Sequence, residues 1–344
     1  RLPRPALPMM ALDGLPLPRD KALEEALIAG MLGLYRFDQF KTKDQDQRFD
    51  LEEILLLDEK QPDAGLYAAV HASSAVVEGV LSPAARVFLL GAIAGDVIGS
   101  VHEHAGTKTT DFALFTPASR FTDDSVLTVA VAEVLASGGN YTDSIQRWAR
   151  AYPRAGYGGA FRKWMWSEAA RPYGSFGNGS GMRASPVGWA RTSLEEVLAE
   201  ARRSAEVTHD HPEGIKGAQA VAAAVFLART GSSKDEIRSA ITTRFDYDLS
   251  RRLDDLRAEY TFDVTCQGSV PESLIAFLES SGWEDAVRKA ISLGGDADTL
   301  ACMTGAVAEA FYGEVPPGIA TEVVARLDDR IRATMGRFAE RFVS

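Results

Sequence analysis

The sequence predicts an all-α protein, a compact bundle of many helices, and three observations support this fold class. Apolar residues recur at the three- and four-residue spacing of an α-helix in most segments after residue 81. Several segments begin with capping signals, such as Ser193 followed three residues later by Glu196. Almost no segment alternates apolar and polar residues as a strand does. We therefore expect one globular domain at 82–344, preceded by an extension at 1–81.

The extension differs in character from the rest of the chain. Five prolines within the first 18 residues favour an extended start. Helical spacing follows at 21–34 and returns at 66–80, on either side of an acidic, polar stretch at 38–63. This segment is expected either to stabilise the main domain as a cap or dimerisation element, or to bind another protein.

The main domain opens with a helix-start signal, because Ser82 suits the N-cap and Pro83 the first helical position. The next helix, at 87–101, is rich in Gly and Ala and apolar nearly all round, so it should be buried. Further helices are expected at 125–135, 193–207, 212–229, 235–244, 271–280, 283–293, 299–312 and 319–342.

Composition argues against several classes of protein. The 37 basic and 48 acidic residues give a net charge of −11, and no run of Lys or Arg suggests a nucleic-acid surface. No apolar run approaches the roughly 18 residues that span a membrane. Cys266 and Cys302 lie in no CxxC pair, so zinc is not expected. This cysteine usage fits a reducing compartment, and we expect a cytoplasmic protein.

Two acidic motifs stand directly before buried helices. Residues 121–125 read FTDDS, and residues 294–299 read GGDADT. Capping of the helix explains either motif alone. Together, however, they offer four carboxylates, which cannot share one buried site without cations. Hard oxygen ligands of this kind suit Mg²⁺, Mn²⁺ or Ca²⁺, and two such ions would activate a water and fix vicinal hydroxyls or phosphates.

A third motif lies on the helix at 87–101. Gly91, Gly95 and Gly99 recur every four residues, which allows another helix to approach closely. Asp96 is a charge on an otherwise apolar helix, so we expect it to cap or hydrogen-bond a neighbouring loop. Glu103 lies about two turns further on, where it is either a site residue or a solvated surface acid.

Two further segments have the residues of a ligand site. The segment at 177–186 reads GNGSGMRASP, and its glycines would let backbone N–H groups approach a phosphate, unless it is simply a flexible loop. The segment at 208–212 reads THDHP and precedes an Ala-rich helix. For this second segment we favour capping by Asp210, or a polar contact to a ligand, over metal binding by its two histidines.

These motifs resemble those of the ADP-ribosylglycohydrolase family. The matching elements are GAIAGDVIGSVHE, FTDDS, GNGSGMRASP, THDHPEGIKGA and SLGGDADTLACMTGA, in the family's order between residues 91 and 306. The resemblance covers about 82–312 and leaves the extension uncovered. It implies an all-α fold that holds two Mg²⁺ or Mn²⁺ ions, and ADP-ribosylated protein as the substrate, with arginine favoured as the acceptor.

The resemblance also implies a role for individual residues. Glu103 matches an acid that lines the site near the metals, and His209 would lie near the ligand. The phosphates and distal ribose would be bound by Asn178, Gly179, Ser180 and Met182. The metal ligands would be Thr122, Asp123, Asp124, Asp296, Asp298 and Thr299.

The expected reaction is hydrolysis of the bond to the anomeric carbon of ADP-ribose. The metals would grip the two ribose hydroxyls, and Asp123 or Glu103 would deprotonate the water or protonate the leaving group. Carboxylates favour the oxocarbenium-like transition state of such a cleavage. Asp298 should be essential, because its loss would remove a metal. A non-catalytic ADP-ribose or metal binder is the alternative, although the intact ligand set argues against it.

The acidic stretch of the extension suggests a second, more specific hypothesis. It could plug the basic nucleotide cleft of an ADP-ribosyltransferase toxin, so that the protein would act as an immunity protein by occlusion as well as by hydrolysis. The residues concerned are Asp44, Asp46, Asp50, Glu52, Glu53, Asp58 and Glu59.

Overall fold

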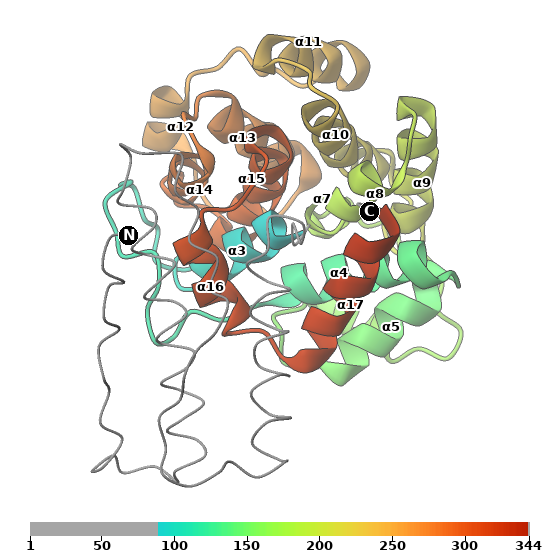
Figure 1. Cartoon of the computed structure of the whole chain (residues 1–344). Helices are drawn as coiled ribbons and strands as arrows, with labels where there is room; N and C mark the ends of the chain where they lie inside the picture. The colour runs from blue at the N-terminus through green and yellow to red at the C-terminus, as the bar shows by residue number, and fades with distance from the viewer. Residues whose placement is uncertain (1–88, 343–344) are drawn as a thin grey trace, which may run out of the picture. The chain divides into compact units, whose positions relative to one another are not determined.

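The computed structural model describes residues 89–342, and this part of the chain is all-α, as predicted (Figure 1). Among these residues the only extended pairing is an isolated antiparallel bridge between Gly177 and Thr265. The extension and the Ser82–Pro83 helix start lie outside the described residues. The helices are α3 Leu90–Gly99, α4 Asp123–Ser137, α5 Tyr141–Ala151, α6 Gly159–Met165, α7 Gly179–Met182, α8 Ser185–Ala190, α9 Leu194–Glu206, α10 Pro212–Arg229, α11 Lys234–Phe245, α12 Leu253–Glu259, α13 Cys266–Leu278, α14 Trp283–Ile291, α15 Ala297–Tyr312, α16 Pro317–Val324 and α17 Asp329–Phe342.

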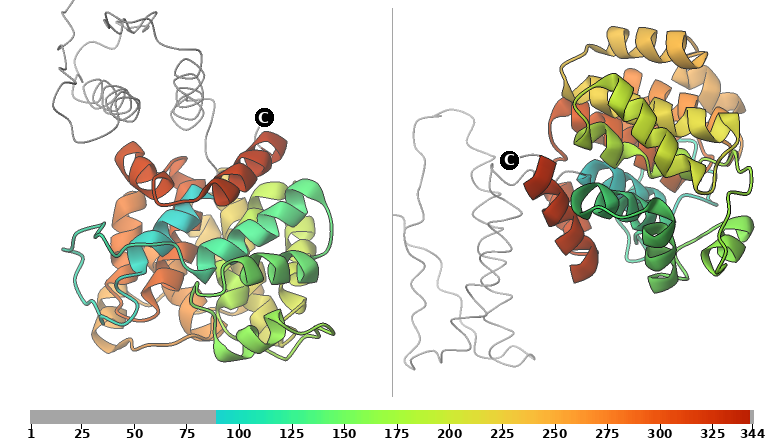
Figure 2. Two further views of the ribbon diagram at one scale, coloured as in Figure 1. Left: turned by 90° about the horizontal axis from the view of Figure 1, so that it is seen from below. Right: turned by 90° about the vertical axis from the view of Figure 1, so that its right-hand side faces the viewer.

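Helices α3 and α15 form the centre of the domain, side by side in every view (Figures 1 and 2). The predicted glycine repeat lies on this contact. A Cβ atom on Gly95 would lie 2.0 Å from the Ala301 carbonyl oxygen, and one on Gly91 would lie 2.3 Å from that of Gly305. At Gly99 the added atom would lie 2.5 Å from Asp298 Cα. The three glycines therefore let the two backbones touch, which brings α3 against the first turn of α15.

The remaining helices surround this pair. Helices α10, α13 and α14 pack against α15, while α4 packs against α3 and is covered by α5 and α17. Two of these helices, α4 and α15, begin at the acidic motifs, so the packing of α3 between them determines where the motifs lie. Every residue of α3 is buried, as the sequence predicts.

A buried carboxyl group closes the far end of the α3–α15 contact. Glu309 on α15 is 4% exposed, and its Oε2 accepts the Gly91 N–H at 3.0 Å, at the free N-terminus of α3. Burial raises the pKa of this carboxyl to about 8, although backbone N–H groups of α3 favour the ionised form. Glu309 is therefore a proton-binding group well away from the acidic motifs.

Some predicted helices begin or end elsewhere. The helix expected from Pro271 starts at Cys266, because Thr265 caps it by accepting the Gly268 N–H at 3.1 Å. The single helix expected at 319–342 is two helices, since Asp328 accepts the Ile331 N–H at 3.0 Å and so starts α17 anew. The glycine-rich segment at 177–186 is not an open loop but contains the short helix α7 and the start of α8.

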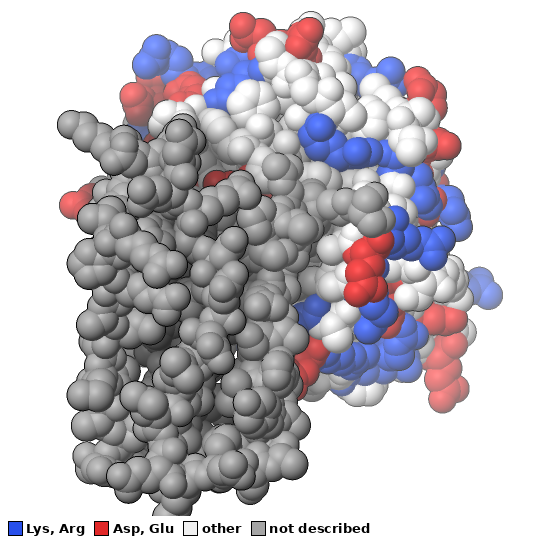
Figure 3. All heavy atoms as spheres, viewed as in Figure 1, with Lys and Arg blue, Asp and Glu red and all other residues white. Residues whose placement is uncertain are grey.

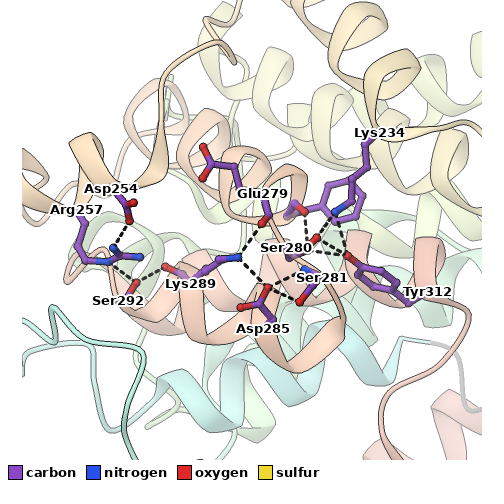
Figure 4. Close-up of polar contacts among 11 residues, drawn as sticks. Lys234, Asp254, Arg257, Glu279, Ser280, Ser281, Asp285, Lys289, Ser292 and Tyr312 are labelled. Carbon is purple, nitrogen blue, oxygen red and sulfur yellow. Dashed lines mark hydrogen bonds and ion pairs between the residues drawn. The ribbon is translucent and has the colours of Figure 1, made fainter.

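A polar network fixes the turns that lead into α15 (Figure 4). Lys289 on α14 donates to the Glu279 carbonyl at 2.7 Å and to Asp285 Oδ2 at 2.8 Å, which holds the α13–α14 turn. Arg257 on α12 donates to Ser292 Oγ at 2.9 Å. Ser292 lies two residues before Gly294 of the Gly294–Gly295 turn, so this network supports the backbone that presents the second acidic motif.

The described surface carries charged side chains of both signs (Figure 3). On the face drawn in Figure 3, basic and acidic side chains are interspersed over the described part. No helix between residues 89 and 342 combines the length and apolarity required to cross a bilayer.

Candidate metal centre

Asp96 binds the start of α4 with both carboxylate oxygens. Its Oδ1 accepts the Thr122 hydroxyl at 2.6 Å, and its Oδ2 accepts the Thr122 N–H at 2.8 Å and the Ser125 N–H at 3.1 Å. The Ser125 hydroxyl donates to the same oxygen. Burial raises the pKa of Asp96, while these hydrogen bonds oppose the shift. The prediction that Asp96 hydrogen-bonds a neighbouring segment is confirmed, and the contact ties α3 to the first acidic motif.

The two acidic motifs meet beside α3 in two overlapping groups. One group consists of Asp96, Asp124 and Asp298, and the other of Glu103, Asp296 and Asp298. In each group, one carboxylate oxygen per residue lies within 4.8 Å of the others. Asp298 belongs to both groups because it stands in the first turn of α15, opposite Gly99. The arrangement thus offers two adjacent sites that share one carboxylate.

Within residues 89–342, no basic side chain forms an ion pair with the buried aspartates of this cluster. The ion pair at its edge joins His104 to Glu103, at 3.8 Å, and His104 is largely exposed. Burial, and then the charge of the neighbouring acids, raises the pKa of both Asp124 and Asp298 well above its usual range. Burial chiefly raises the pKa of Asp296 as well. Such a cluster needs protons or cations to be tolerable.

The donor set fits hard divalent cations. Every ligand atom in the two groups is a carboxylate oxygen, the type that Mg²⁺ and Mn²⁺ prefer. The buried Asp124 Oδ1 has no hydrogen-bond partner among residues 89–342, which is costly for a charged oxygen unless an ion binds it. Its other oxygen lies 3.3 Å from both the Thr122 and the Thr299 hydroxyls. The two threonines of the motifs therefore border the first group.

Asp123 and Glu103 are the more accessible acids of the cluster. Asp123 belongs to neither group, and its N–H donates to the Ala155 carbonyl at 2.9 Å. Burial and the charge of Asp96 raise the pKa of Asp123 to about 8. The side chain of Glu103 is 34% exposed, and its pKa is raised by burial and then by Asp296. Asp123 can therefore hold a proton near neutral pH, and the pKa of Glu103 is shifted in the same direction.

The segment at 177–182 lies against the second acidic motif. The Asn178 side-chain amide donates to Asp296 Oδ2 at 2.7 Å and to Ser269 Oγ at 3.2 Å, so it orients this carboxylate. The Ser180 hydroxyl is buried and donates to the Gly214 carbonyl at 2.7 Å. Met182 Sδ lies 4.0 Å from the Thr299 hydroxyl. Ligand binding by these residues stays a prediction.

His209 lies on the other side of the same segment. Cβ atoms added to Gly179 and Gly177 would lie 3.4 Å and 3.7 Å from His209 Nε2, so this nitrogen faces the backbone of the segment. The expected capping by Asp210 is wrong. His211 is the cap of α10 instead, because its Nδ1 accepts the Glu213 N–H at 3.1 Å. Asp210 is turned to the Gly174 N–H, at 2.7 Å.

A basic side chain holds the loop after Glu103 against the second motif. Lys108 Nζ donates to the carbonyl oxygens of Tyr260 and Leu293, each at 2.6 Å. Its side chain also lies beside Gly294, whose φ of 70° places it in the left-handed region that glycine favours. No feature of the sequence predicts this role for Lys108, since a single Lys in a polar loop usually points to solvent.

Comparison with known proteins agrees with the geometry. The family model described as ADP-ribosylglycohydrolase matches residues 81–344. The chain is 27% identical over 309 residues to ADP-ribosylhydrolase ARH3 of Mus musculus, which covers 66% of this chain and 83% of that protein. It is 26% identical over 262 residues to ADP-ribosylarginine hydrolase Tri1 of Pseudomonas putida strain GB-1, which covers 67% and 70% respectively.

A solved structure, described as an ADP-ribosylglycohydrolase-related protein complex, has a similar fold. It superposes with a TM-score of 0.55 at 24% sequence identity and covers 74% of this chain and 98% of that chain. At this identity the likeness supports the fold alone.

Proposed function

The chain belongs to the ADP-ribosylglycohydrolase family, and on this premise we propose that it is a metal-dependent hydrolase that removes ADP-ribose from modified protein side chains. The observation that carries the proposal is the pair of overlapping carboxylate groups that share Asp298. Two Mg²⁺ or Mn²⁺ ions held there would bind the ribose hydroxyls and lower the pKa of a water molecule. The proposed ligands are Thr122, Asp123, Asp124, Asp296, Asp298 and Thr299, joined by Asp96 or Glu103.

The protein's own acids would move the protons. Either Asp123 or Glu103 takes a proton from the attacking water or gives one to the leaving group, since both carry raised pKa values and border the cluster. Asn178 would hold Asp296 in place through its 2.7 Å hydrogen bond. The burial of the aspartates keeps bulk water from competing for the site.

Stoichiometry of metal binding tests the division into two sites. We expect the parent to bind two Mn²⁺ ions, Asp296→Asn to retain the first group and bind one ion, and Asp298→Asn to lose most binding and turnover. Calorimetric titration with Mn²⁺, paired with release of ADP-ribose from a modified protein, measures both effects. If Asp298→Asn binds Mn²⁺ and turns over like the parent, the proposed centre is wrong.

The same assays separate the two candidate acid–base residues. The residue that transfers the proton is the one whose isosteric variant, Asp123→Asn or Glu103→Gln, retains metal binding and loses turnover. A variant that loses both metal and turnover identifies a ligand instead. The pH profile of kcat gives a second readout, because removal of the proton-transfer group should abolish one limb of it.

Arginine is the acceptor we favour, because Tri1 is named an ADP-ribosylarginine hydrolase. The surface beside the cluster supports a polypeptide substrate. Phe262 and Val264 are 51% and 48% exposed, and the Val264 carbonyl accepts the Asn178 N–H at 2.8 Å. The Phe262 ring lies 6.0 Å from that of His104, the neighbour of Glu103. Exposed apolar groups at a site mouth are suited to contact a protein chain.

Two substrates test whether Phe262 and Val264 bind the polypeptide or form part of the nucleotide site. The double variant Phe262→Ser, Val264→Ser should raise KM for an ADP-ribosylated protein several-fold and leave KM for free ADP-ribosyl-arginine unchanged. An equal rise for both substrates would contradict a role in binding the polypeptide. Trp166, which is 59% exposed, gives a control variant, Trp166→Ser, that should change neither value.

We also propose that the acidic extension binds an ADP-ribosyltransferase toxin, so that the protein protects a cell by occlusion and by hydrolysis. Its support is the density of acidic residues at 44–59. A chain lacking residues 1–80 should lose the toxin complex and keep hydrolysis. An unfolded product would instead indicate that the extension stabilises the domain.

A further inference from the structure

Arg183 is a buried cation without a carboxylate partner among residues 89–342. Its side chain is 0% exposed, and one nitrogen, Nη2, donates to the Ser204 carbonyl at 3.1 Å and to the Thr208 hydroxyl oxygen at 2.8 Å. Its Nε and Nη1 have no hydrogen-bond partner. Burying an unpaired charge is costly, and an apolar side chain of similar volume would pack here at less cost. The position of this guanidinium therefore suggests a role besides packing.

Thr208 links the guanidinium to His209. An arginine nitrogen can only donate, so the Thr208 oxygen accepts from Arg183. The same oxygen lies 2.6 Å from His209 Nδ1. Thr208 is fully buried, and no other acceptor for its single hydroxyl proton is found in the described part of the chain. The proton therefore points at Nδ1, because a buried hydroxyl that donates to nothing would cost about 1–3 kcal/mol.

This assignment fixes the state of the histidine. A ring whose Nδ1 accepts a hydrogen bond is neutral and carries its proton on Nε2. The neighbouring charges agree with this state: Arg183 disfavours a second cation, the Tyr173 ring lies 6.3 Å away, and the Asp210 carboxylate is engaged by the Gly174 N–H. Burial, and then Arg183, lowers the pKa of His209 well below its usual range.

The protonated nitrogen faces a narrow backbone turn. His209 Nε2 has no hydrogen-bond partner among the described residues, and the positions of absent Cβ atoms at Gly177 and Gly179 lie within 3.7 Å of it. Side chains at these two positions would fill the space in front of the nitrogen. Glycine keeps this space open, so that an anionic oxygen could meet the Nε2–H and the backbone of the turn.

We propose that Arg183 is a positioning residue, which acts through Thr208 to hold His209 as a neutral Nε2–H donor aimed at a phosphate of bound ADP-ribose. The phosphate contact rests on the proposed function, whereas the hydrogen-bond relay does not. Arg183 donates to the Ser204 carbonyl as well as to the Thr208 oxygen, so the guanidinium holds the Thr208 hydroxyl in place with its proton turned away from Arg183. Removing the guanidinium removes this restraint and makes the Nδ1–H form of His209 accessible.

Matched variants at Thr208 test the relay without removing the buried cation. Nitrogen-15 NMR of the histidine rings, with His209 assigned by the His209→Gln variant, reports the tautomer in the ligand-free protein. We expect the Nε2–H form in the parent and in Thr208→Ser, which keeps the hydroxyl, and a mixture of tautomers in Thr208→Val, which has nearly the same shape. Arg183→Met should also give a mixture if circular dichroism shows it folded. An unchanged tautomer in Thr208→Val overturns the relay.

Binding of ADP-ribose tests the consequence. Calorimetry should show roughly 5- to 10-fold weaker binding for Thr208→Val and parent-like binding for Thr208→Ser, the change expected for one misaligned hydrogen bond. Parent-like binding by Thr208→Val, together with a mixture of tautomers, would overturn the phosphate contact. If the parent itself binds no ADP-ribose, the proposed function fails, whereas the tautomer experiment alone decides the relay.

Discussion

Replacing Asp124 by Asn should stabilise the protein in the absence of metal and prevent its stabilisation by metal. Asp124 is buried, with one oxygen unpartnered and carboxylates of Asp96 and Asp298 nearby. The amide has the same shape and no charge. Metal-free protein would therefore lose a repulsion, and metal-loaded protein would lose a ligand. A change in stability that has opposite signs with and without metal indicates a cation site, because replacing a purely structural aspartate would change stability in the same direction in both conditions.

The structure sets the size of both effects. Each neighbouring carboxylate has an oxygen within 4.8 Å, where two unit charges repel by about 3.5 kcal/mol at an effective dielectric constant of about 20. Uptake of a proton relieves part of this repulsion, so we expect a gain of about 1–3 kcal/mol, or roughly 2–10 °C in Tm for a domain of this size. Mg²⁺ at a hundred times its Kd should stabilise the parent by about 2.7 kcal/mol and the variant hardly at all.

Thermal unfolding in EDTA and in excess Mg²⁺ measures both quantities. Asp111→Asn, which removes an exposed carboxylate, is the matched control and should leave the Tm unchanged in both buffers. The reasoning is refuted if Asp124→Asn lowers the Tm in EDTA, or if Mg²⁺ raises the Tm of parent and variant equally.

Three further predictions concern the packing and support of the centre. Gly95→Ala should destabilise the domain by about 1–3 kcal/mol in denaturant unfolding, because its Cβ would collide with α15. The control, Gly336→Ala, adds a Cβ to a helix where no atom lies near it, and should be neutral or slightly stabilising. Burial raises the pKa of Glu309 to about 8, so the native state holds a proton that the unfolded state releases near pH 4.5. In metal-saturated protein, the free energy of unfolding of the parent, relative to that of Glu309→Gln, should therefore fall as the pH rises from 4.5 to 8, by at most about 5 kcal/mol. A difference between the two proteins that does not change with pH would contradict this. Asn178→Ala should weaken Mn²⁺ binding by about 10- to 100-fold in calorimetry, and an unchanged affinity would show that the amide does not orient its carboxylate.

Local signals in the sequence predicted most of the helices. The capping box of Ser193 and Glu196 is present, and the helix expected at 212–229 has those bounds. The breaks that the sequence analysis missed depend on tertiary contacts. Asp328, for example, divides the run at 319–342, because it caps α17 and also accepts at 2.7 Å the hydroxyl of Tyr152, the residue that follows α5.

The candidate site was predictable only in part, for the same reason. Two motifs with paired acids indicate that carboxylates gather, but no spacing along the chain shows that they divide into two groups around Asp298. That division depends on the close contact of α3 with α15, which adds Asp96 to one group, and on the position of Glu103, which completes the other. The support of Asp296 by Asn178 likewise joins residues that are 118 positions apart.

Capping and metal binding are not alternatives at this centre. Thr122 caps α4 by accepting the Asp124 N–H, and it also donates to Asp96, so the structural role that explains a single motif is fulfilled. Capping fixes the start of α4, and from the first turn of this helix Asp124 Oδ2 reaches the Thr299 hydroxyl of α15, at 3.3 Å. If capping were the only role of this motif, however, its side-chain oxygens would have hydrogen-bond partners. The buried and unpartnered Oδ1 of Asp124 is the feature that capping leaves unexplained, and a bound cation is the simplest physical partner for it.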